Sequence, residues 1–164
     1  MTKEIITQDY VKQLFEYRDG ALYWKHSPAH NVRAGSKAGN IQSEGYRSIK
    51  INNKTYKAHR LIFLMFHGWL PEKVDHKDAN TSNNQIENLR PATSSENSFN
   101  AKKRVDNKSG VKNVYWNKQC NKWAVQVSIN NKHKYFGLYD DLELADLVAQ
   151  EARDKYHGAF ANHG

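Results

Sequence analysis

VDHKDANTSNNQIENLRPATSSENSFN (residues 74–100) is the stretch that decides the fold. It begins with Val74-Asp75-His76 and ends with Ser98-Phe99-Asn100. Its Asp-His pair closes a short run typical of a strand, and a polar loop rich in Asn follows. A second short run carries Asn88-Leu89-Arg90. Thr93-Ser94-Ser95-Glu96 then fits the capping-box pattern, in which Thr93 accepts a backbone hydrogen bond and Glu96 reaches back. The stretch therefore predicts two short strands and a helix, with Asn97 in the first turns of that helix.

The composition predicts several small apolar cores. Only 38% of the 164 residues are hydrophobic, and a chain of this length can hold one domain or two to three small modules. No apolar run approaches the roughly 18 residues that span a bilayer, and Met1-Thr2-Lys3-Glu4 lacks the apolar core of a signal peptide. We therefore expect no membrane partner and a location in the cytoplasm of a host cell. Cys120, the single cysteine, excludes an internal disulfide and a Cys-x-x-Cys zinc site.

Charge is distributed unevenly along the chain, whose formal net charge is +8. Residues 101–139 contain nine Lys or Arg and one acidic residue, whereas residues 140–157 contain six acidic residues and two basic ones. A basic block favours a polyanion partner such as double-stranded DNA, because each neutralised phosphate releases condensed counterions. A generally solvated charged surface is the alternative.

The N-terminal part predicts a small module with a helix and a hairpin. Thr7 can cap a short helix that ends at the Asp19-Gly20 turn. Residues 45–51 and 54–59 predict a hairpin around Asn52-Asn53, since Asn tolerates the positive φ angles of a tight turn.

Residues 60–67 form the most apolar segment and predict a buried helix that ends at Gly68. The histidines at its two ends, His59 and His67, are interpreted as capping or packed imidazoles. Beyond the central stretch, the composition changes sharply at residues 101–110, which we interpret as a basic linker able to follow a phosphate backbone without a fixed fold.

The C-terminal part predicts a sheet covered on one face by a helix. The expected strands are 114–116, 122–129 and 134–137, with Asn130-Asn131 as a hairpin turn and a helix at about 141–157. Apolar and polar residues alternate along the second strand, so one of its faces is apolar and the other polar. The helix is expected to cover the apolar face with Leu144, Ala145, Val148, Ala149, Ala152 and Tyr156.

Five short motifs follow one another in the first two thirds of the chain, namely His59-Arg60-Leu61, Asp75-His76, Asn83-Asn84, Asn88-Leu89-Arg90 and Glu96-Asn97. Their order resembles the active site of HNH endonucleases, in the His-Asn-Asn form of many phage and intron-encoded homing nucleases. The resemblance implies that His76 is the general base and that Asn88 orients its imidazole. It also implies that Asp75 and Asn97 bind a metal ion.

Hydrolysis of a phosphodiester requires a deprotonated water, a cation on the scissile phosphate and stabilisation of the leaving oxygen. By the resemblance, Asp75 and Asn97 supply one carboxylate and one amide to the metal. A site of hard oxygen ligands favours Mg²⁺, for which Mn²⁺ can substitute, and no zinc is expected.

Polar residues beside these candidates have their own interpretations. Asn83 and Asn84 are interpreted as structural residues that bridge the loop backbone. Arg90 is expected either to contact a phosphate or to form a salt bridge with Glu87 or Asp78.

A second set of motifs occupies residues 109–160, in the order Ser109-Gly110-Val111, Val114-Tyr115-Trp116, Lys122-Trp123, Phe136-Gly137 and Glu143-Leu144-Ala145. Their order resembles the AP2/ERF DNA-binding domain, in the sparse form appended to phage homing nucleases. The resemblance implies a sheet whose open face contacts DNA through Tyr115, Asn117, Lys122, Gln126, Ser128, His133 and Tyr135. The arginine-rich readers of that family are mostly absent, so its base preferences do not carry over. Further DNA contacts are expected from the linker, at Lys102, Lys103, Arg104 and Lys108.

These expectations combine into an α+β protein. Its segments are a small N-terminal module with a β-hairpin (1–58), a ββα-metal HNH nuclease core (59–101), a basic linker (102–109) and an AP2-like domain of three antiparallel strands and one helix (110–164). The expected function is site-specific DNA cleavage of the HNH homing type by a single-metal mechanism. A non-catalytic, sequence-specific DNA-binding regulator that uses the AP2-like domain is the alternative, and a restriction-like nuclease would share the chemistry. Monomer and homodimer remain equally open.

Overall fold

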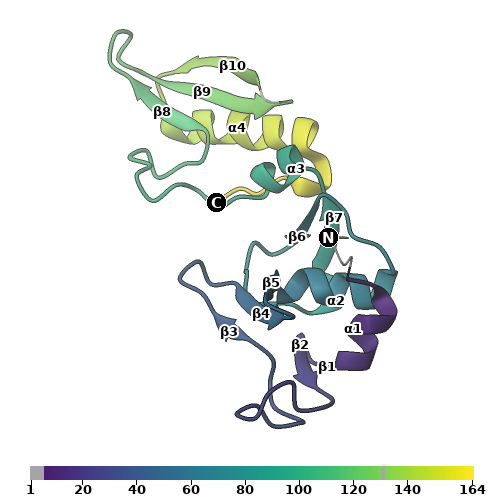
Figure 1. Ribbon diagram of the computed structural model, residues 1–164. Coiled ribbons are helices and arrows are strands. Elements are labelled where there is room, and N and C mark those ends of the chain that lie inside the picture. Colours follow the sequence, from purple (N-terminus) through teal and green to yellow (C-terminus); the bar gives the residue numbers. More distant parts are fainter. Residues whose placement is uncertain (1–5, 131) are drawn as a thin grey trace. The chain divides into compact units, whose positions relative to one another are not determined.

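The computed structural model describes residues 6–130 and 132–164 (Figure 1). The chain divides into two compact units, Met1–Ala92 and Thr93–Gly164, which are described separately below. The predictions for Met1-Thr2-Lys3-Glu4 and for the second turn residue, Asn131, lie outside the described residues. No helix in the described part of the chain is long and apolar enough to cross a membrane.

The first unit consists of short antiparallel sheets packed around one central helix. Its helices are α1 (Gln8–Leu14), α2 (Ala58–His67) and the 3-10 turn η1 (Ile86–Asn88). Its strands are β1 (Phe15–Arg18), β2 (Ala21–Trp24), β3 (Asn40–Ile41), β4 (Arg47–Ile51), β5 (Lys54–Lys57), β6 (Lys73–His76) and β7 (Leu89–Ala92). They pair as β1-β2, β3-β4-β5 and β6-β7.

The predicted N-terminal helix is capped by Thr7 as expected, but it is shorter than predicted. The Thr7 hydroxyl accepts a hydrogen bond from the Tyr10 backbone N–H at 3.3 Å, and the helix ends before Phe15. Phe15 instead begins a strand that pairs with β2 around the Asp19-Gly20 turn. The reason is that an extended Phe15 places its ring against Trp24, with the ring centroids 4.5 Å apart.

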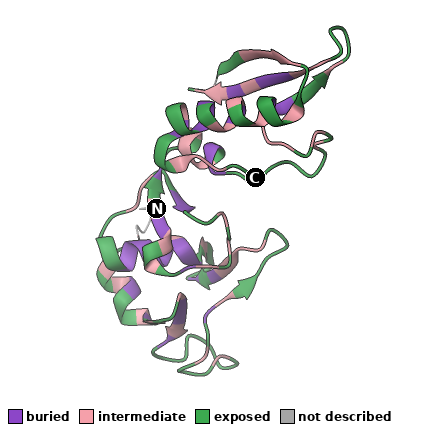
Figure 2. Cartoon of the chain, turned by 180° about the vertical axis from the view of Figure 1, so that it is seen from behind, coloured by how far each residue is buried: buried purple, intermediate pink, exposed green. Residues whose placement is uncertain are grey.

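The hairpin and the apolar helix of the first unit are confirmed. Asn52 and Asn53 both have positive φ, 46° and 63°, as a two-residue hairpin turn requires. The α2 helix ends at Gly68, which adopts a left-handed φ of 77°. Figure 2 shows the buried residues of this unit gathered along α2, where five consecutive side chains, those of residues 61–65, are buried.

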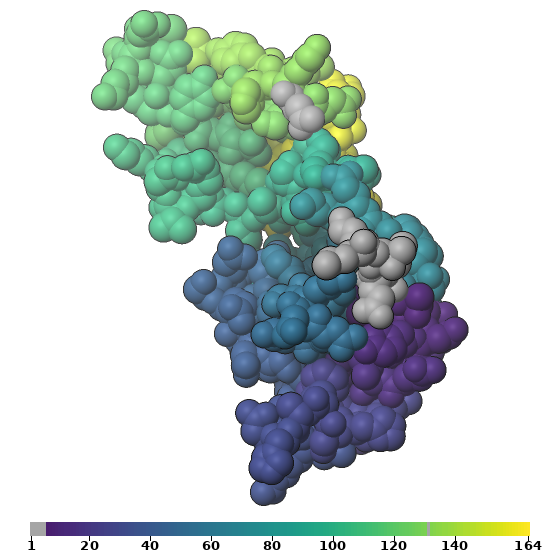
Figure 3. Space-filling view, viewed as in Figure 1, coloured from purple at the N-terminus to yellow at the C-terminus, as the bar shows by residue number. Residues whose placement is uncertain are grey.

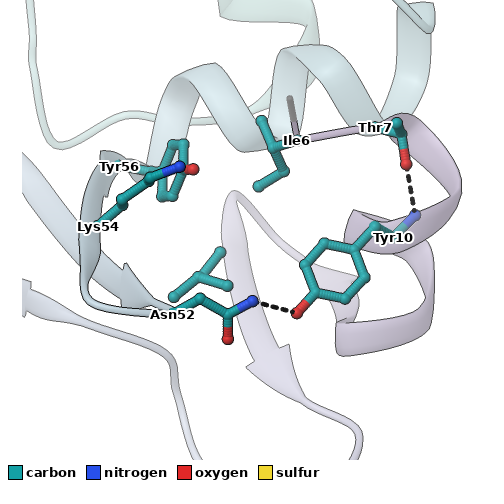
Figure 4. A pocket seen from close by; sticks show the side chains of 7 residues that line it. Ile6, Thr7, Tyr10, Asn52, Lys54 and Tyr56 are labelled. Carbon is teal, nitrogen blue, oxygen red and sulfur yellow. Dashed lines mark hydrogen bonds between the residues drawn. The ribbon is translucent and has the colours of Figure 1, made fainter. Parts of the chain in front are cut away.

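A cavity of about 210 Å³ lies between α1 and the β4-β5 hairpin. In Figure 4 the Tyr10 hydroxyl lies against the Asn52 amide, which donates to it at 3.1 Å, and Tyr56 lies on the other side of the cavity. Apart from this hydrogen bond, the cavity leaves a space between the hairpin and the N-terminal helix. The buried residues of the central core around α2 form one continuous cluster.

Gly39 is a position of the first unit where both the backbone conformation and the neighbouring chain require glycine. Its φ is +77°, and an added Cβ would lie 2.6 Å from Ile49 Cγ1 and would collide with the Ser48 carbonyl oxygen of β4. We expect Gly39→Ala to lower the free energy of unfolding by about 3 kcal/mol, because the left-handed backbone and the overpacking each cost about 1–3 kcal/mol. Urea unfolding of the variant tests this, with Gly35→Ala, which has the same φ but open space, as the control for backbone strain alone.

The second unit consists of a three-stranded antiparallel sheet with a long helix along one face (Figure 1). Its strands are β8 (Val114–Asn117), β9 (Lys122–Ile129) and β10 (Lys132–Tyr139), in the order β10-β9-β8. The helices are α3 (Ser94–Phe99), α4 (Leu142–His157) and the 3-10 turn η2 (Gly158–Phe160). All three strands and the long helix are where the sequence predicts them, and β10 is longer than predicted, with a β-bulge between Tyr135 and Gly137.

The predicted apolar face of α4 is correct except at Leu144. Ala145, Ala149 and Ala152 are buried against the sheet, but Leu144 is 48% exposed. The spacing of the three alanines fixes the centre of the buried stripe, and Leu144 lies one position, or about 100°, away from it. Small alanines at the centre allow α4 to approach Val125 of β9 closely.

The sequence predicts a boundary after residue 101, whereas the two units divide after Ala92. The difference arises because α3 packs with the second unit. The Phe99 ring stacks on His157 with centroids 3.9 Å apart and planes 4° from parallel. The Lys112 ammonium donates to the carbonyl oxygens of Phe99 and Asn162 at 3.0 and 2.9 Å. Burial lowers the pKa of Lys112 to about 8, and the charge of Arg153 adds to this effect. The end of α3 is therefore tied to the C-terminal sheet and helix.

Candidate functional site

Strand β6 carries the predicted metal ligand Asp75 and the predicted general base His76, and strand β7 pairs with it. In their register Asp75 lies opposite Arg90, and His76 lies opposite Leu89. Strand β6 ends at His76, and one further backbone bond, from Lys77 N–H to the Asn88 carbonyl at 2.9 Å, leads into the loop. Because successive strand residues point to opposite faces, Asp75 and His76 have different side-chain partners.

His76 is held by Asn84. The His76 Nε2 and the Asn84 Oδ1 lie 2.8 Å apart, and both residues are buried. Because an amide oxygen can only accept a hydrogen bond, Nε2 is the donor in this contact. This geometry is that of an imidazole fixed in one tautomer, as a general base requires.

Asn88 does not orient the imidazole, contrary to the expectation from the motif. Its amide donates to Asp78 Oδ1 at 2.9 Å and to the Asn83 carbonyl at 2.8 Å, and its own oxygen accepts from the Asp78 backbone N–H. Asn88 therefore braces the loop after β6, while Asn84, interpreted from sequence as structural, contacts His76. The loop contains several Asn residues, and the sequence gives no signal that tells which of them braces the loop and which contacts His76.

Asp78 is the centre of that loop. Asn83 donates to its second carboxylate oxygen at 2.7 Å, and the Asn80 backbone N–H donates to the first at 2.8 Å. Burial alone would raise the pKa of Asp78, but the hydrogen bonds from Asn83, Asn80 and Asn88 together lower it below its ordinary value. The charged carboxylate thus organises the turn that delivers Asn84 to His76.

Asp75 and Arg90 form a buried ion pair. The Arg90 Nε lies 2.8 Å from Asp75 Oδ2, and the two side chains are 13% and 7% exposed. The sequence-based alternatives of a salt bridge from Arg90 to Glu87 or Asp78 were wrong, since β-strand register sets Asp75 directly opposite. The pair thus places a carboxylate and a guanidinium in direct contact where little water reaches them.

His59 lies beside His76 as a packed imidazole, as interpreted from the sequence. The ring centroids of His59 and His76 are 4.9 Å apart in an edge-to-face arrangement. The ring centroid of Tyr46, the residue before β4, lies 5.2 Å from that of His59. Burial lowers the pKa of His59 to about 3, with contributions from the charges of His76, Lys57 and Arg60. His59 is therefore neutral at physiological pH and adds no fixed charge next to His76.

Two comparisons with known proteins bear on this part of the chain. Residues 56–99 match the family model of the HNH endonuclease. The chain is also 32% identical over 117 residues to Protein 3.8 of Escherichia phage T7, an alignment that covers 70% of this chain and 96% of the phage protein. The chain belongs to the Protein 3.8 family and carries an HNH endonuclease domain. That domain indicates DNA endonuclease activity. No solved structure matches the chain significantly.

The metal ligands expected for the HNH domain come from both units. Asp75 lies on β6, and Asn97 lies on α3 of the second unit. The capping box that precedes Asn97 is confirmed, since the Thr93 N–H donates to Glu96 Oε2 at 2.8 Å and the Thr93 hydroxyl accepts from the Glu96 N–H at 3.2 Å. Within residues 6–130 and 132–164 no three His, Cys, Asp or Glu side chains gather as a metal cluster. A metal shared by Asp75 and Asn97 stays a prediction.

The seven predicted DNA-facing residues beyond the HNH domain lie on one face of the second unit's sheet. Across the strands, Asn117 lies opposite Lys122, Gln126 opposite Tyr135, and Ser128 opposite His133, and Tyr115 lies opposite Ala124 on the same face. Several already have partners: the Asn117 oxygen accepts from two backbone N–H groups of the next turn, Lys122 pairs with Asp140 at 3.0 Å, and Ser128 Oγ lies 3.0 Å from His133 Nδ1. Their role in DNA binding stays a prediction.

The segment predicted as a linker is exposed over residues 101–106 and is joined to this sheet at Ser109, whose hydroxyl donates to the Val114 carbonyl at 2.7 Å. Lys103 donates to the Gly110 carbonyl at 2.6 Å, and Arg104 forms a two-point ion pair with Asp106. A groove of about 380 Å³ is lined by Lys102, Lys103 and Arg104 from this segment, by Lys112 beyond it, and by Tyr115, Gln126, Ser128 and His133 from the sheet. Within the second unit, basic side chains and the open sheet face thus border the same groove, whereas Lys108 lines a different pocket.

Asn84→Ala tests the new assignment of the His76 partner. Removing the acceptor leaves the buried Nε2–H of His76 without this bond, which costs about 1–3 kcal/mol. We expect a corresponding loss, about 5- to 150-fold, in the nicking rate at saturating DNA, with little change in DNA affinity. Single-turnover nicking and fluorescence anisotropy measure the two quantities. Asn40→Ala, at an exposed position of β3, is the control, and a wild-type rate in Asn84→Ala would remove Asn84 from the site.

Proposed function

We propose that this protein is a site-specific DNA endonuclease of the homing type, in which the HNH domain cuts one strand and the C-terminal sheet selects the site. The observation that carries the proposal is the buried His76 imidazole fixed by Asn84, 2.8 Å away, within the region that matches the HNH model. A histidine with a fixed tautomer can take a proton from water, which is the step that limits phosphodiester hydrolysis near neutral pH.

His76 acts as the general base in this proposal. Its Nε2 bonds to Asn84 Oδ1, which holds the ring in one orientation for taking up the proton of the attacking water. Tyr46 and the neutral His59 pack around the ring and exclude water from its sides. The Asn88–Asp78 hydrogen bonds hold the loop from which Asn84 projects.

A divalent cation fits the donors that the motif assigns. Asp75 offers a carboxylate, which also contacts Arg90, and Asn97 offers an amide oxygen. Oxygen donors of this kind suit Mg²⁺ or Mn²⁺ and not Zn²⁺, which prefers sulfur and nitrogen. When bound, such a cation supplies charge for the scissile phosphate and the leaving oxygen. Asp75 then has two tasks, holding the cation and anchoring Arg90.

The second unit would supply the affinity for double-stranded DNA. The chain carries a net charge of +8, and the groove beside the open sheet face is lined by Lys102, Lys103 and Arg104. Phosphate contacts of this kind give salt-dependent affinity, and the polar side chains of the sheet face would read base edges in the major groove. One active site per chain cuts one strand in each binding event, so a double-strand break needs a homodimer or a second event by the monomer.

A supercoiled-plasmid assay tests the proposal. We expect conversion to the nicked circle in Mg²⁺ or Mn²⁺ and none in EDTA, while DNA binding persists in EDTA. Selection from a randomised-site library in Mg²⁺ then tests whether cleavage is site-specific. Binding without nicking in any divalent ion would overturn the nuclease proposal and favour a sequence-specific DNA-binding regulator.

A further inference from the structure

Two tryptophans lie side by side on the C-terminal sheet, Trp116 on the edge strand β8 and Trp123 on the central strand β9, on the face opposite the predicted DNA-reading residues. Trp116 on β8 lies directly across from Trp123 on β9, with ring centroids 4.9 Å apart and planes at 70°. Trp123 shares its sheet face with Val125, which packs against α4, but Trp116 is 44% exposed. The exposed indole of Trp116, supported by a second indole, presents an aromatic surface to solvent.

The tryptophan pair forms one wall of a pocket of about 440 Å³. The opposite wall is the loop of residues 106–109, which Ser109 fixes by donating to the Val114 carbonyl at 2.7 Å. This loop lies at the surface of the second unit, where the chain approaches β8 (Figures 1 and 3). The volume falls in the range of pockets that hold small organic ligands.

The charges around the pocket favour an anion. Lys108 from the loop and Lys118 from the β8–β9 turn both line it, and no described residue forms an ion pair with either. The one acidic residue of the lining, Asp106, is neutralised by the two-point ion pair with Arg104. The pocket therefore combines an aromatic surface with uncompensated positive charge.

We infer that this pocket binds an unpaired nucleotide of single-stranded DNA, with the base against Trp116 and the phosphates at Lys108 and Lys118. Aromatic stacking with flanking lysines is how proteins hold single strands without reading sequence. A base within a duplex has both faces covered by its neighbours, so the same indole would select unpaired bases. The inference rests on the proposed function only in that DNA is the partner. It uses none of the HNH residues, and of the seven residues of the open sheet face only Tyr115 also lines this pocket.

Anisotropy titrations with the full-length chain in EDTA test the inference, because no strand is cut under these conditions. The probes are labelled dT12, a 12-mer of the same backbone in which every nucleotide is abasic, and a closed dumbbell duplex without ends. We expect wild-type protein to bind dT12 about 10-fold more tightly than the abasic strand, the effect of stacking about one base. Trp116→Ala should remove this preference, and Trp116→Phe should keep most of it.

Two controls separate stacking from charge and from folding. Lys118→Ala should weaken binding of dT12 and of the abasic strand by the same factor, and Trp69→Ala, at a 51% exposed indole of the first unit, should change neither. Equal wild-type affinity for dT12 and the abasic strand would overturn the inference without reference to any variant. A preference that persists in Trp116→Ala would overturn it as well. Dumbbell binding and plasmid nicking report on the proposed function independently.

Discussion

His76→Ala is expected to lower the rate of plasmid nicking by about 10²- to 10⁴-fold, the usual contribution of a positioned general base. The variant loses the imidazole that Asn84 holds. His59 cannot replace it as the base, because burial and neighbouring charges lower the pKa of His59 to about 3. DNA affinity should stay within about twofold, because the predicted phosphate and base contacts lie elsewhere. Single-turnover nicking in Mg²⁺ and anisotropy with the same duplex measure the two effects.

The control for this experiment is His26→Ala, an exposed histidine of the same unit. It should nick at the wild-type rate, so that a loss in His76→Ala cannot come from the removal of any histidine. Addition of imidazole to His76→Ala should restore part of the rate if the missing group is a base, whereas a collapsed site would not respond. Nicking by His76→Ala at the wild-type rate would contradict the assignment.

Local sequence signals predicted much of this fold because the interactions behind them are local. Thr7 caps a helix, Asn52-Asn53 turns a hairpin and Thr93 with Glu96 closes a capping box, and each involves residues at most four apart. Alternation along β9 predicted the face that α4 covers. Phe15 was assigned to a helix because its spacing fits one, and its contact with Trp24, nine residues away, decides otherwise.

The sequence predicted which residues belong to the candidate site but not which of them bond to one another. A motif places Asp75, His76 and several Asn residues together, yet which Asn meets the imidazole depends on how the loop after β6 folds around Asp78. Asn84 reaches His76, and Asn88 is used up by Asp78 and by the Asn83 carbonyl. The packing of α3 on His157 is similarly invisible in sequence, because the contact joins residues 58 positions apart.

Acid should destabilise the first unit through His59. Burial lowers its pKa from the ordinary 6.5 to about 3, so between these pH values the unfolded chain binds a proton that the folded chain does not. The contribution of His59 to stability is then complete above pH 6.5 and is lost as the pH falls toward 3. Each pKa unit is worth about 1.4 kcal/mol, so the full loss approaches about 5 kcal/mol.

His59→Phe isolates this effect, because it keeps an aromatic ring against Tyr46 and His76 and cannot take up a proton. We expect the free energy of unfolding, measured by urea titration at pH values from 7.5 to 4, to fall more steeply in the wild type than in His59→Phe. His26→Phe, at an exposed site, should follow the wild-type curve. The ring-proton NMR shift of His59 gives a direct check, since it should stay constant down to about pH 4. A titration of that shift near pH 6.5 would mean that water reaches the ring, and His59 would then not shield the neighbouring His76.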